Sequence, residues 1–227
     1  MKKTQLISAY RVISELFLYP EDRDEDRIRA GMKALAGAPA ALRTPLTTFL
    51  TTPAASDTAE YVATLELAPP VPLYLGAYLF EEPKSCRGAG ISGRNSYMLE
   101  LANIYRHFGV EFSGREMADF VPVVVEFLAV SLERREEDRI GLRRYLVETL
   151  LIKGIESLLT ALRKHESPYV LLVDALGVAL AKDITLMARE PKWQPPAEGE
   201  GVGQGAQPSI HGMPGATRLT QENGAKL

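Results

Sequence analysis

The sequence predicts an all-α protein, a single-domain helical bundle, on two observations. Apolar residues recur at helical spacing through most of the 227 residues, as in Leu6, Tyr10, Ile13 and Phe17. The hydrophobic content of 46% is enough to bury a substantial core. We therefore expect one globular helical domain over residues 1–188, followed by a Pro/Gly-rich disordered tail over residues 189–227, whose few aliphatic residues cannot offset the entropy of ordering it.

The first elements follow directly from this spacing. We expect an amphipathic helix over residues 4–18, ended by Tyr19 and Pro20, because the residue before a proline is disfavoured in a helix. The charged run over residues 21–29 carries Ile28, which with Met32 and Leu35 gives helical spacing, so we expect a second helix with a strongly solvated side that ends at residues 36–39. A short helix is expected from Ala40 to Leu50, and Ser56 or Asp57 caps the next one.

The middle of the chain is harder to assign. Periodicity does not decide between helix and strand for Leu73 to Phe80, and we expect helix because no partner strand is evident nearby. Residues 81–93 form a long loop of a kind that often carries function. The next helical stripe ends at Gly109, a left-handed C-cap, and Ser113 to Glu116 fits a capping box that starts another helix.

The second half continues with three long helices. The helix after Ser113 has a β-branched apolar face, so burial must override its poor helix propensity, and Pro122 lies in its first turns or bends it. A long helix runs from Leu142 to Arg163, and Ser167-Pro168 opens the last one.

Composition excludes several classes of function. A net charge of −3, from 26 basic and 29 acidic residues, gives no basic face for nucleic acid. The single cysteine, Cys86, excludes an internal disulfide framework and a cysteine-rich metal site. No apolar run reaches the roughly 18 residues of a membrane span, and residues 1–18 lack the features of a signal peptide. We expect a soluble, cytoplasmic protein.

Nothing in the chain predicts an enzyme. His211 lies in the tail, and His107 and His165 are explained as structural residues near helix ends. The glycines at positions 88, 90 and 93 follow no strand and lack the Lys-Ser/Thr of a phosphate loop. What remains is an aromatic segment with Tyr74, Tyr78 and Phe80 near an acidic helix start. It suits a groove for a peptide with arginines near a hydrophobic run, or these aromatic residues are simply core.

Residues 116–129, EMADFVPVVVEFLA, are similar to the pattern E-x-P-D-H-x-P-x-x-L-E-F-x-A of the NarJ/TorD/DmsD group of molybdoenzyme maturation chaperones, closest to its NarJ branch. The landmarks at residues 61–66, 73–80 and 87–88, and Tyr105 and Gly109, follow the same order, so the resemblance covers roughly residues 5–185. The family's proline is Ala118 here and its histidine is Phe120, so a role of that imidazole does not transfer.

The resemblance implies a TorD-like fold without a prosthetic group of its own. It also implies binding to the N-terminal segment of a molybdopterin-enzyme catalytic subunit, with or without a twin-arginine signal, until the molybdenum cofactor is inserted. Asp119 and Glu116 would then meet basic residues of this client, Tyr74, Tyr78, Phe80 and Phe120 would line its apolar contact, and Arg87 and Gly88 would shape the loop. Glu126 would face the same groove or only anchor its helix.

Two other hypotheses remain open at this stage. The chain would be a permanent helical regulatory or scaffold subunit of a redox complex if its apolar stripes formed a fixed interface. A small helical hydrolase or nucleotide-binding enzyme is the third, and the missing phosphate loop counts against it. The chain is expected as a monomer or a homodimer.

Overall fold

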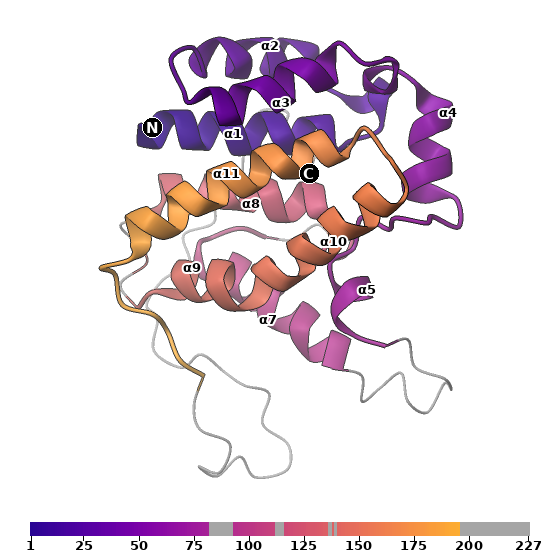
Figure 1. Ribbon diagram of the computed structural model, residues 1–227. Helices are drawn as coiled ribbons and strands as arrows, with labels where there is room; N and C mark the ends of the chain where they lie inside the picture. Colours follow the sequence, from indigo (N-terminus) through magenta and orange to yellow (C-terminus); the bar gives the residue numbers. More distant parts are fainter. Residues whose placement is uncertain (82–92, 112–115, 136–137, 139, 196–227) are drawn as a thin grey trace.

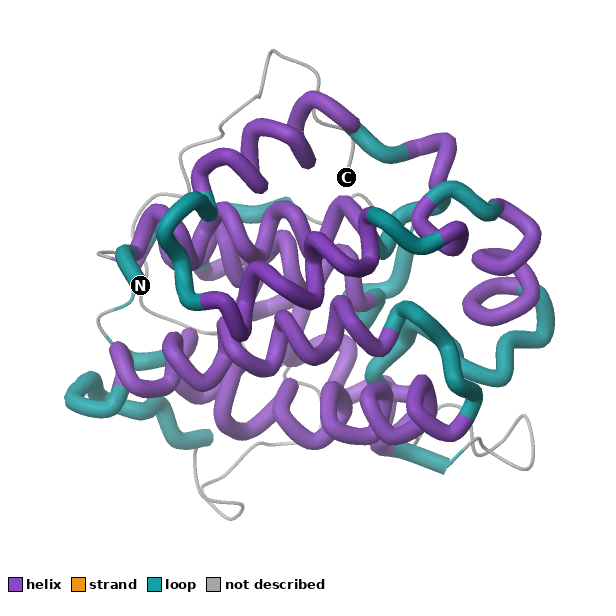
Figure 2. The backbone as a smooth tube through the Cα atoms, turned by 45° about the horizontal axis from the view of Figure 1, so that its top comes forward, coloured by secondary structure: helices purple, strands orange, loops and turns teal. Residues whose placement is uncertain are grey.

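The computed structural model describes residues 1–81, 93–111, 116–135, 138 and 140–195, and this part of the chain is helical with no strand (Figures 1 and 2). The all-α prediction is confirmed. The helices are α1 Lys3–Leu16, α2 Glu25–Ala34, α3 Ala40–Leu50, α4 Thr58–Tyr61, α5 Gly76–Leu79, α7 Gly93–His107, α8 Val121–Glu133, α9 Leu142–Tyr145, α10 Ile152–Lys164 and α11 Val170–Met187. Short 3₁₀ turns lie at Pro20–Asp22 and Pro53–Ala55, and π-helical turns at Val62–Glu66 and Leu146–Leu151.

The helices pack around α1, α8 and α11. Helix α1 contacts α2, α8 and α11, and α11 also packs on α3 and α10. In Figure 1, α1, α2 and α3 lie together on one side, α7, α9 and α10 lie on the other, and α8 and α11 run between them. The apolar stripe Leu6, Tyr10, Ile13 and Phe17 is fully buried in this arrangement, so the expected face of the first helix is confirmed.

Local signals set most helix ends as expected. Helix α3 has the predicted bounds, and Asp57 caps α4 by accepting hydrogen bonds from the N–H groups of Ala59 and Glu60 at 2.9 and 3.1 Å. Gly109 has φ +69°, the left-handed conformation predicted for it after α7. Capping residues satisfy backbone groups that have no partner within the helix, which is why these ends are readable in sequence.

The start of α8 corrects one prediction. The helix begins at Val121 with Pro122 in its first turn, not at the expected capping box, of which residues 113–115 lie outside the described part. Proline is favoured there because its missing N–H would have no helical partner. Val124 and Val125 are 1% exposed, so burial does override the poor helix propensity of the β-branched run, as expected.

The segment Leu73 to Phe80 corrects a second prediction. Only Gly76–Leu79 is helical, while Tyr74 forms an isolated antiparallel bridge with Phe120. Leu75 N donates to Asp119 O at 3.0 Å and Val121 N donates to Leu73 O at 2.8 Å. The extended partner that seemed absent is the turn before α8, which lies far along the chain.

The long helix expected from Leu142 to Arg163 is continuous but not uniformly α-helical. Its middle, Leu146–Leu151, is π-helical, and the first part, α9, begins after Gly141 at φ +77°. The buried stripe passes through the π turn at ordinary helical spacing, as Val147, Leu151, Ile155, Leu158 and Leu162.

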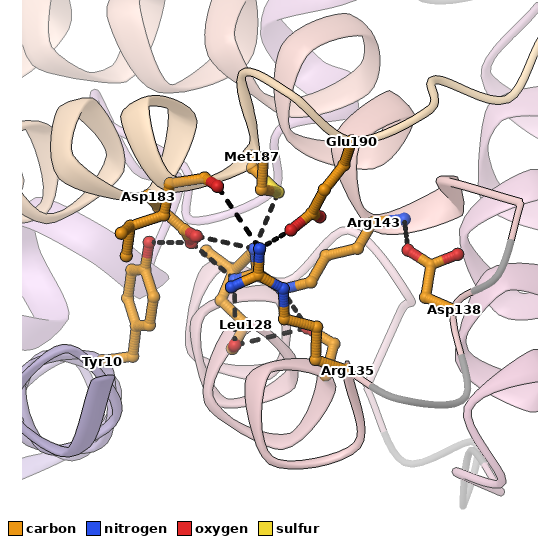
Figure 3. Close-up of polar contacts among 10 residues, drawn as sticks. Tyr10, Leu128, Arg135, Asp138, Arg143, Asp183, Met187 and Glu190 are labelled. Atoms are coloured by element: carbon orange, nitrogen blue, oxygen red, sulfur yellow. Dashed lines mark hydrogen bonds and ion pairs between the residues drawn. The ribbon is translucent and has the colours of Figure 1, made fainter.

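A buried ionic network joins four helices (Figure 3). The guanidinium of Arg143 on α9 donates to both carboxylate oxygens of Asp183 on α11, at 2.7 and 2.5 Å, and its Nε donates to Ser131 on α8 at 3.0 Å. Tyr10 on α1 donates to Asp183 Oδ2 at 2.6 Å. Arg143 is 1% exposed and Asp183 is fully buried, so each charge depends on the other, and loss of one would leave a buried unpaired ion.

Residues 188–195 cross back over α9 and the π turn. The Trp193 ring packs edge-on against Tyr145 with centroids 4.9 Å apart, and Lys192 Nζ lies 3.2 Å from Glu148 Oε2. Trp193 N donates to Gly141 O at 3.3 Å. This part of the segment assigned to the tail thus packs on the helical domain; residues 196–227 lie outside the described part.

Candidate peptide-binding site

The site lies where residues 73–75 meet the turn at residues 116–120. Their backbone bridge places the Tyr74 and Phe120 rings side by side, with centroids 5.2 Å apart and planes tilted by 36°. Both rings are half-buried. Phe120 N donates to Met117 O at 3.0 Å, and Tyr105 on α7 donates through its hydroxyl to Ala118 O at 2.7 Å. The turn is therefore held by its own backbone and by α7.

Asp119 lies beneath this turn and fixes the two segments to each other. Its side chain is fully buried, and Oδ2 accepts from the Gly76 N–H at 2.8 Å. Arg94 Nη2 on α7 lies 3.5 Å from the same oxygen, while Oδ1 is buried without a hydrogen-bond partner in the described part of the chain. The carboxylate is fully buried, and in this structure it holds the segment at Gly76 to the turn that carries Phe120.

The outer face of the turn combines apolar and acidic groups. Met117 is 40% exposed, and the exposed Glu116 accepts a hydrogen bond from the Tyr74 hydroxyl at 2.8 Å. Burial, the hydrogen bond to Glu116 and the charges of Glu116, Asp119 and Glu66 raise the pKa of Tyr74 to about 12. These carboxylates make the surface around Tyr74 electronegative, so it favours cations.

The remaining expected site residues separate from this group. Tyr78 is half-buried and donates to Pro72 O at 2.9 Å, beside the Tyr74 segment. Phe80 turns to α7 and packs on Tyr97 with centroids 5.5 Å apart. Arg87 and Gly88 lie outside the described residues.

Glu126 forms ion pairs with residues of α1 and α2. It is 7% exposed on α8, where Oε1 lies 2.5 Å from Arg27 Nη2 on α2 and 3.8 Å from Arg11 Nε on α1. Arg27 also pairs with Glu15 on α1 at 2.9 Å. These contacts hold α8 to α1 and α2, and none of them involves the aromatic pair.

Sequence reasoning missed three residues that shape the site. Gly76 lies so close to Asp119 that a Cβ there would be 2.6 Å from Oδ2, and its place within an aromatic run was the only available signal. Arg94 and Glu66 are charged residues in polar or mixed surroundings, with no local pattern that distinguishes them from solvent-facing charges.

The described residues offer neither a metal site nor a membrane-spanning helix. No cluster of three or more His, Cys, Asp or Glu side chains in these residues is arranged to hold a metal ion. Among the same residues, no helix has the length and apolar character to cross a membrane.

The described part of the chain thus combines an all-helical body with a half-buried aromatic pair beside carboxylates. The family model for the nitrate reductase delta subunit matches residues 33–173, more than half of the chain, and the chain belongs to this family of NarJ/TorD-type chaperones. The match includes Tyr74, Glu116, Asp119 and Phe120. Family members are assembly factors for nitrate reductase and its molybdenum cofactor and not catalytic enzymes. No curated protein matches the chain.

Proposed function

We propose that this chain binds, in the cytoplasm, the N-terminal segment of a nitrate reductase-like catalytic subunit and holds that subunit until its molybdenum cofactor is inserted. The observation that supports this most is the surface formed by Tyr74, Phe120, Met117 and Glu116, because it offers apolar contact and negative charge within one short stretch. A peptide with a basic residue next to a hydrophobic run complements both features.

The aromatic pair provides the apolar part of the contact. Rings that are only half-buried keep apolar area available to a partner, and burial of apolar area is the main favourable contribution to most protein association. Tyr74 and Phe120 also lose little conformational freedom on binding, since their rings already pack on each other and the Tyr74 hydroxyl is hydrogen-bonded to Glu116. The pair is therefore suited to be the centre of the interface, with Met117 at its edge.

The carboxylates orient the bound peptide, because they attract its basic residue to one side of the aromatic pair. Glu116 is exposed and keeps acceptor capacity beyond its hydrogen bond from Tyr74, and Glu66 is exposed nearby. Asp119 adds negative charge from beneath without a direct contact. An arginine of the client would bind Glu116 through charge-assisted hydrogen bonds.

Phe120 distinguishes this site from the family pattern, which has a histidine there. A phenyl ring has no proton to exchange, so recognition at this position rests on packing and does not switch between pH 6 and 8 as a histidine would. Binding of the client peptide should therefore change little over this range.

Calorimetric titration with a synthetic peptide tests the proposal. The peptide is the first ~40 residues of a nitrate reductase-like catalytic subunit from the same genome, and we expect a Kd near 1 μM, about −8 kcal/mol. Phe120→Ala and Glu116→Gln should each weaken binding by about 5- to 30-fold, or about 1–2 kcal/mol. Glu25→Gln, an exposed carboxylate on α2, is the matched control and should leave the Kd unchanged.

Two results would reject the proposal. One is the absence of binding to any such peptide while the protein is recovered from cells in a fixed stoichiometric complex, which would assign it as a permanent scaffold subunit. The other is tight binding that neither Phe120→Ala nor Glu116→Gln alters, which would place the client elsewhere on the chain.

A further inference from the structure

A concave surface lies between the start of α4 and the corner where α10 gives way to α11, which are neighbours in Figure 1. It is an open cleft of about 820 Å³, bounded by residues 52–60 and 162–171. Its apolar lining includes Ala54, Leu162, Val170 and Leu171. None of the residues considered above as part of the peptide-binding site lines it.

The walls of the cleft are held by buried contacts behind them. Tyr169 is fully buried and packs against Phe49 and Tyr61, with ring centroids 5.1 and 6.0 Å apart. The buried guanidinium of Arg23 donates to Ala55 O, next to the lining residue Ala54, and to Leu18 O at 3.0 Å. The cleft therefore has a preformed shape, which lowers the entropic cost of binding.

The charge of the cleft is negative. Three carboxylates, Asp57, Glu60 and Glu166, line it together with one cation, Arg163, which already pairs with Asp174 at 3.0 Å. Glu60 accepts a hydrogen bond from Thr64 at 3.0 Å and keeps its second oxygen for another donor. An apolar floor with a carboxylate rim is the same combination that surrounds Tyr74.

One element joins the cleft to the peptide-binding site. Glu60 on α4 lines the cleft, and Glu66, at the end of the π turn that continues α4, lies near Tyr74. Six residues of helix span ~9 Å, a distance that about three residues of an extended peptide cover. Tyr61, between them, contacts Tyr169 behind the cleft, and burial and then the charge of Glu66 raise its pKa.

We infer that the cleft binds a second stretch of the same client polypeptide, one with a basic residue beside small or branched apolar side chains. This inference rests on the proposed function, because the first stretch is the one bound at Tyr74 and Phe120. Two linked contacts raise affinity without strengthening either contact, since binding of the first stretch holds the second at high effective concentration.

Titrations with the client peptide and with its two halves, of about 20 residues each, test the inference. The full peptide should bind at least about 10-fold more tightly than the better half. The double variant Glu60→Gln/Glu166→Gln and, separately, Leu171→Ala should each weaken the full peptide by about 5- to 20-fold. Neither variant should change the Kd of the half-peptide whose binding is weakened by Phe120→Ala. Unchanged binding of that half-peptide also shows that each variant is folded. Glu25→Gln is again the control.

The outcomes separate the two proposals. If Phe120→Ala weakens the full peptide and one half, but the cleft variants change neither, the cleft inference is wrong and the proposed function stands. If Phe120→Ala changes no Kd, the proposed function fails. A stoichiometry of two chains per peptide would assign the cleft to a second copy of the chain, and this result would overturn the inference.

Discussion

The Gly76 N–H donates to Asp119 Oδ2 at 2.8 Å, and a Cβ on Gly76 would lie 2.6 Å from that same oxygen. The hydrogen bond and the missing side chain are two parts of one arrangement, because the carboxylate approaches the backbone more closely than any other residue type permits. The arrangement fixes the bridge that places Tyr74 beside Phe120.

Gly76→Ala should therefore destabilise the protein by about 1–3 kcal/mol, the usual cost of an added methyl group in a packed site. Its Cβ would also meet Arg94 Nε at 2.9 Å. Urea unfolding followed by circular dichroism measures the change. Gly177→Ala is the matched control, since Gly177 is exposed inside α11 with nothing within 4 Å of a Cβ, and it should gain about 0.5–1 kcal/mol. Equal effects of the two variants would contradict the close-approach argument.

Asp119→Ala should cost about 1–3 kcal/mol, because it leaves the buried Gly76 N–H without an acceptor. Asp119→Asn keeps an acceptor oxygen for that N–H and should cost less. Since the carboxylate is fully buried, peptide affinity per folded molecule should change little in Asp119→Asn. A loss of binding as large as that of Glu116→Gln, with stability intact, would show instead that the client reaches Asp119 directly.

Glu126→Gln tests whether Glu126 belongs to the peptide-binding site. The change removes the charge that pairs with Arg27 at 2.5 Å, and we expect a cost of about 1–2 kcal/mol, since the arginine keeps partial solvent contact. Peptide affinity should be unchanged. Glu133 lies on the same helix as Glu126 and forms an exposed ion pair with Arg11 of α1. Glu133→Gln should therefore cost less than about 1 kcal/mol. If Glu126→Gln weakens peptide binding and Glu133→Gln does not, Glu126 is part of the peptide-binding site.

The helices whose ends carry local signals could be predicted from sequence. Helix α3 has its expected bounds because Pro39 precedes it and Thr51, Thr52 and Pro53 follow. The π turn at Leu146–Leu151 could not be predicted, because Val147, Leu151 and Ile155 follow one another at the four-residue steps of an ordinary α-helix. Spacing alone predicts one continuous helix there.

Contacts between distant segments explain what the sequence could not predict. Tyr74 is extended because its partner is Phe120, and Glu126 faces Arg27, 99 positions away. The residue types at Tyr74, Glu116 and Phe120 suggested a peptide-binding surface, and the structure brings these three together. It also places Asp119 beneath them and Phe80 against Tyr97, since burial depends on neighbours that a local pattern does not contain.

Tyr10→Phe should cost about 1–3 kcal/mol at pH 7, because Asp183 loses a buried hydrogen bond of 2.6 Å. Burial and then the charge of Asp183 raise the pKa of Tyr10 well above 10 in the folded protein. Above pH 10 the unfolded chain therefore releases a proton that the folded chain keeps, and stability falls as pH rises. The variant lacks this contribution, so its stability should fall less steeply above pH 10, by up to about 1.4 kcal/mol per pH unit. Urea unfolding between pH 7 and 11 measures it, and identical slopes would contradict the assignment.

Gly141→Ala should detach residues 190–193 from α9. A Cβ on Gly141 would lie 2.0 Å from Pro191 O, so the segment must move away, and the Trp193 contact with Tyr145 is lost. Trp193 is the single tryptophan of the chain, and its fluorescence should shift to longer wavelength as the ring meets water. Gly37→Ala is the matched control, because Gly37 has a similar left-handed φ of +80° with nothing within 4 Å of a Cβ. Both variants carry the cost of an alanine in that conformation, about 1–2 kcal/mol, but only Gly141→Ala should change the emission while helix content is retained. An unchanged spectrum in Gly141→Ala would mean that this segment does not pack on the helical domain.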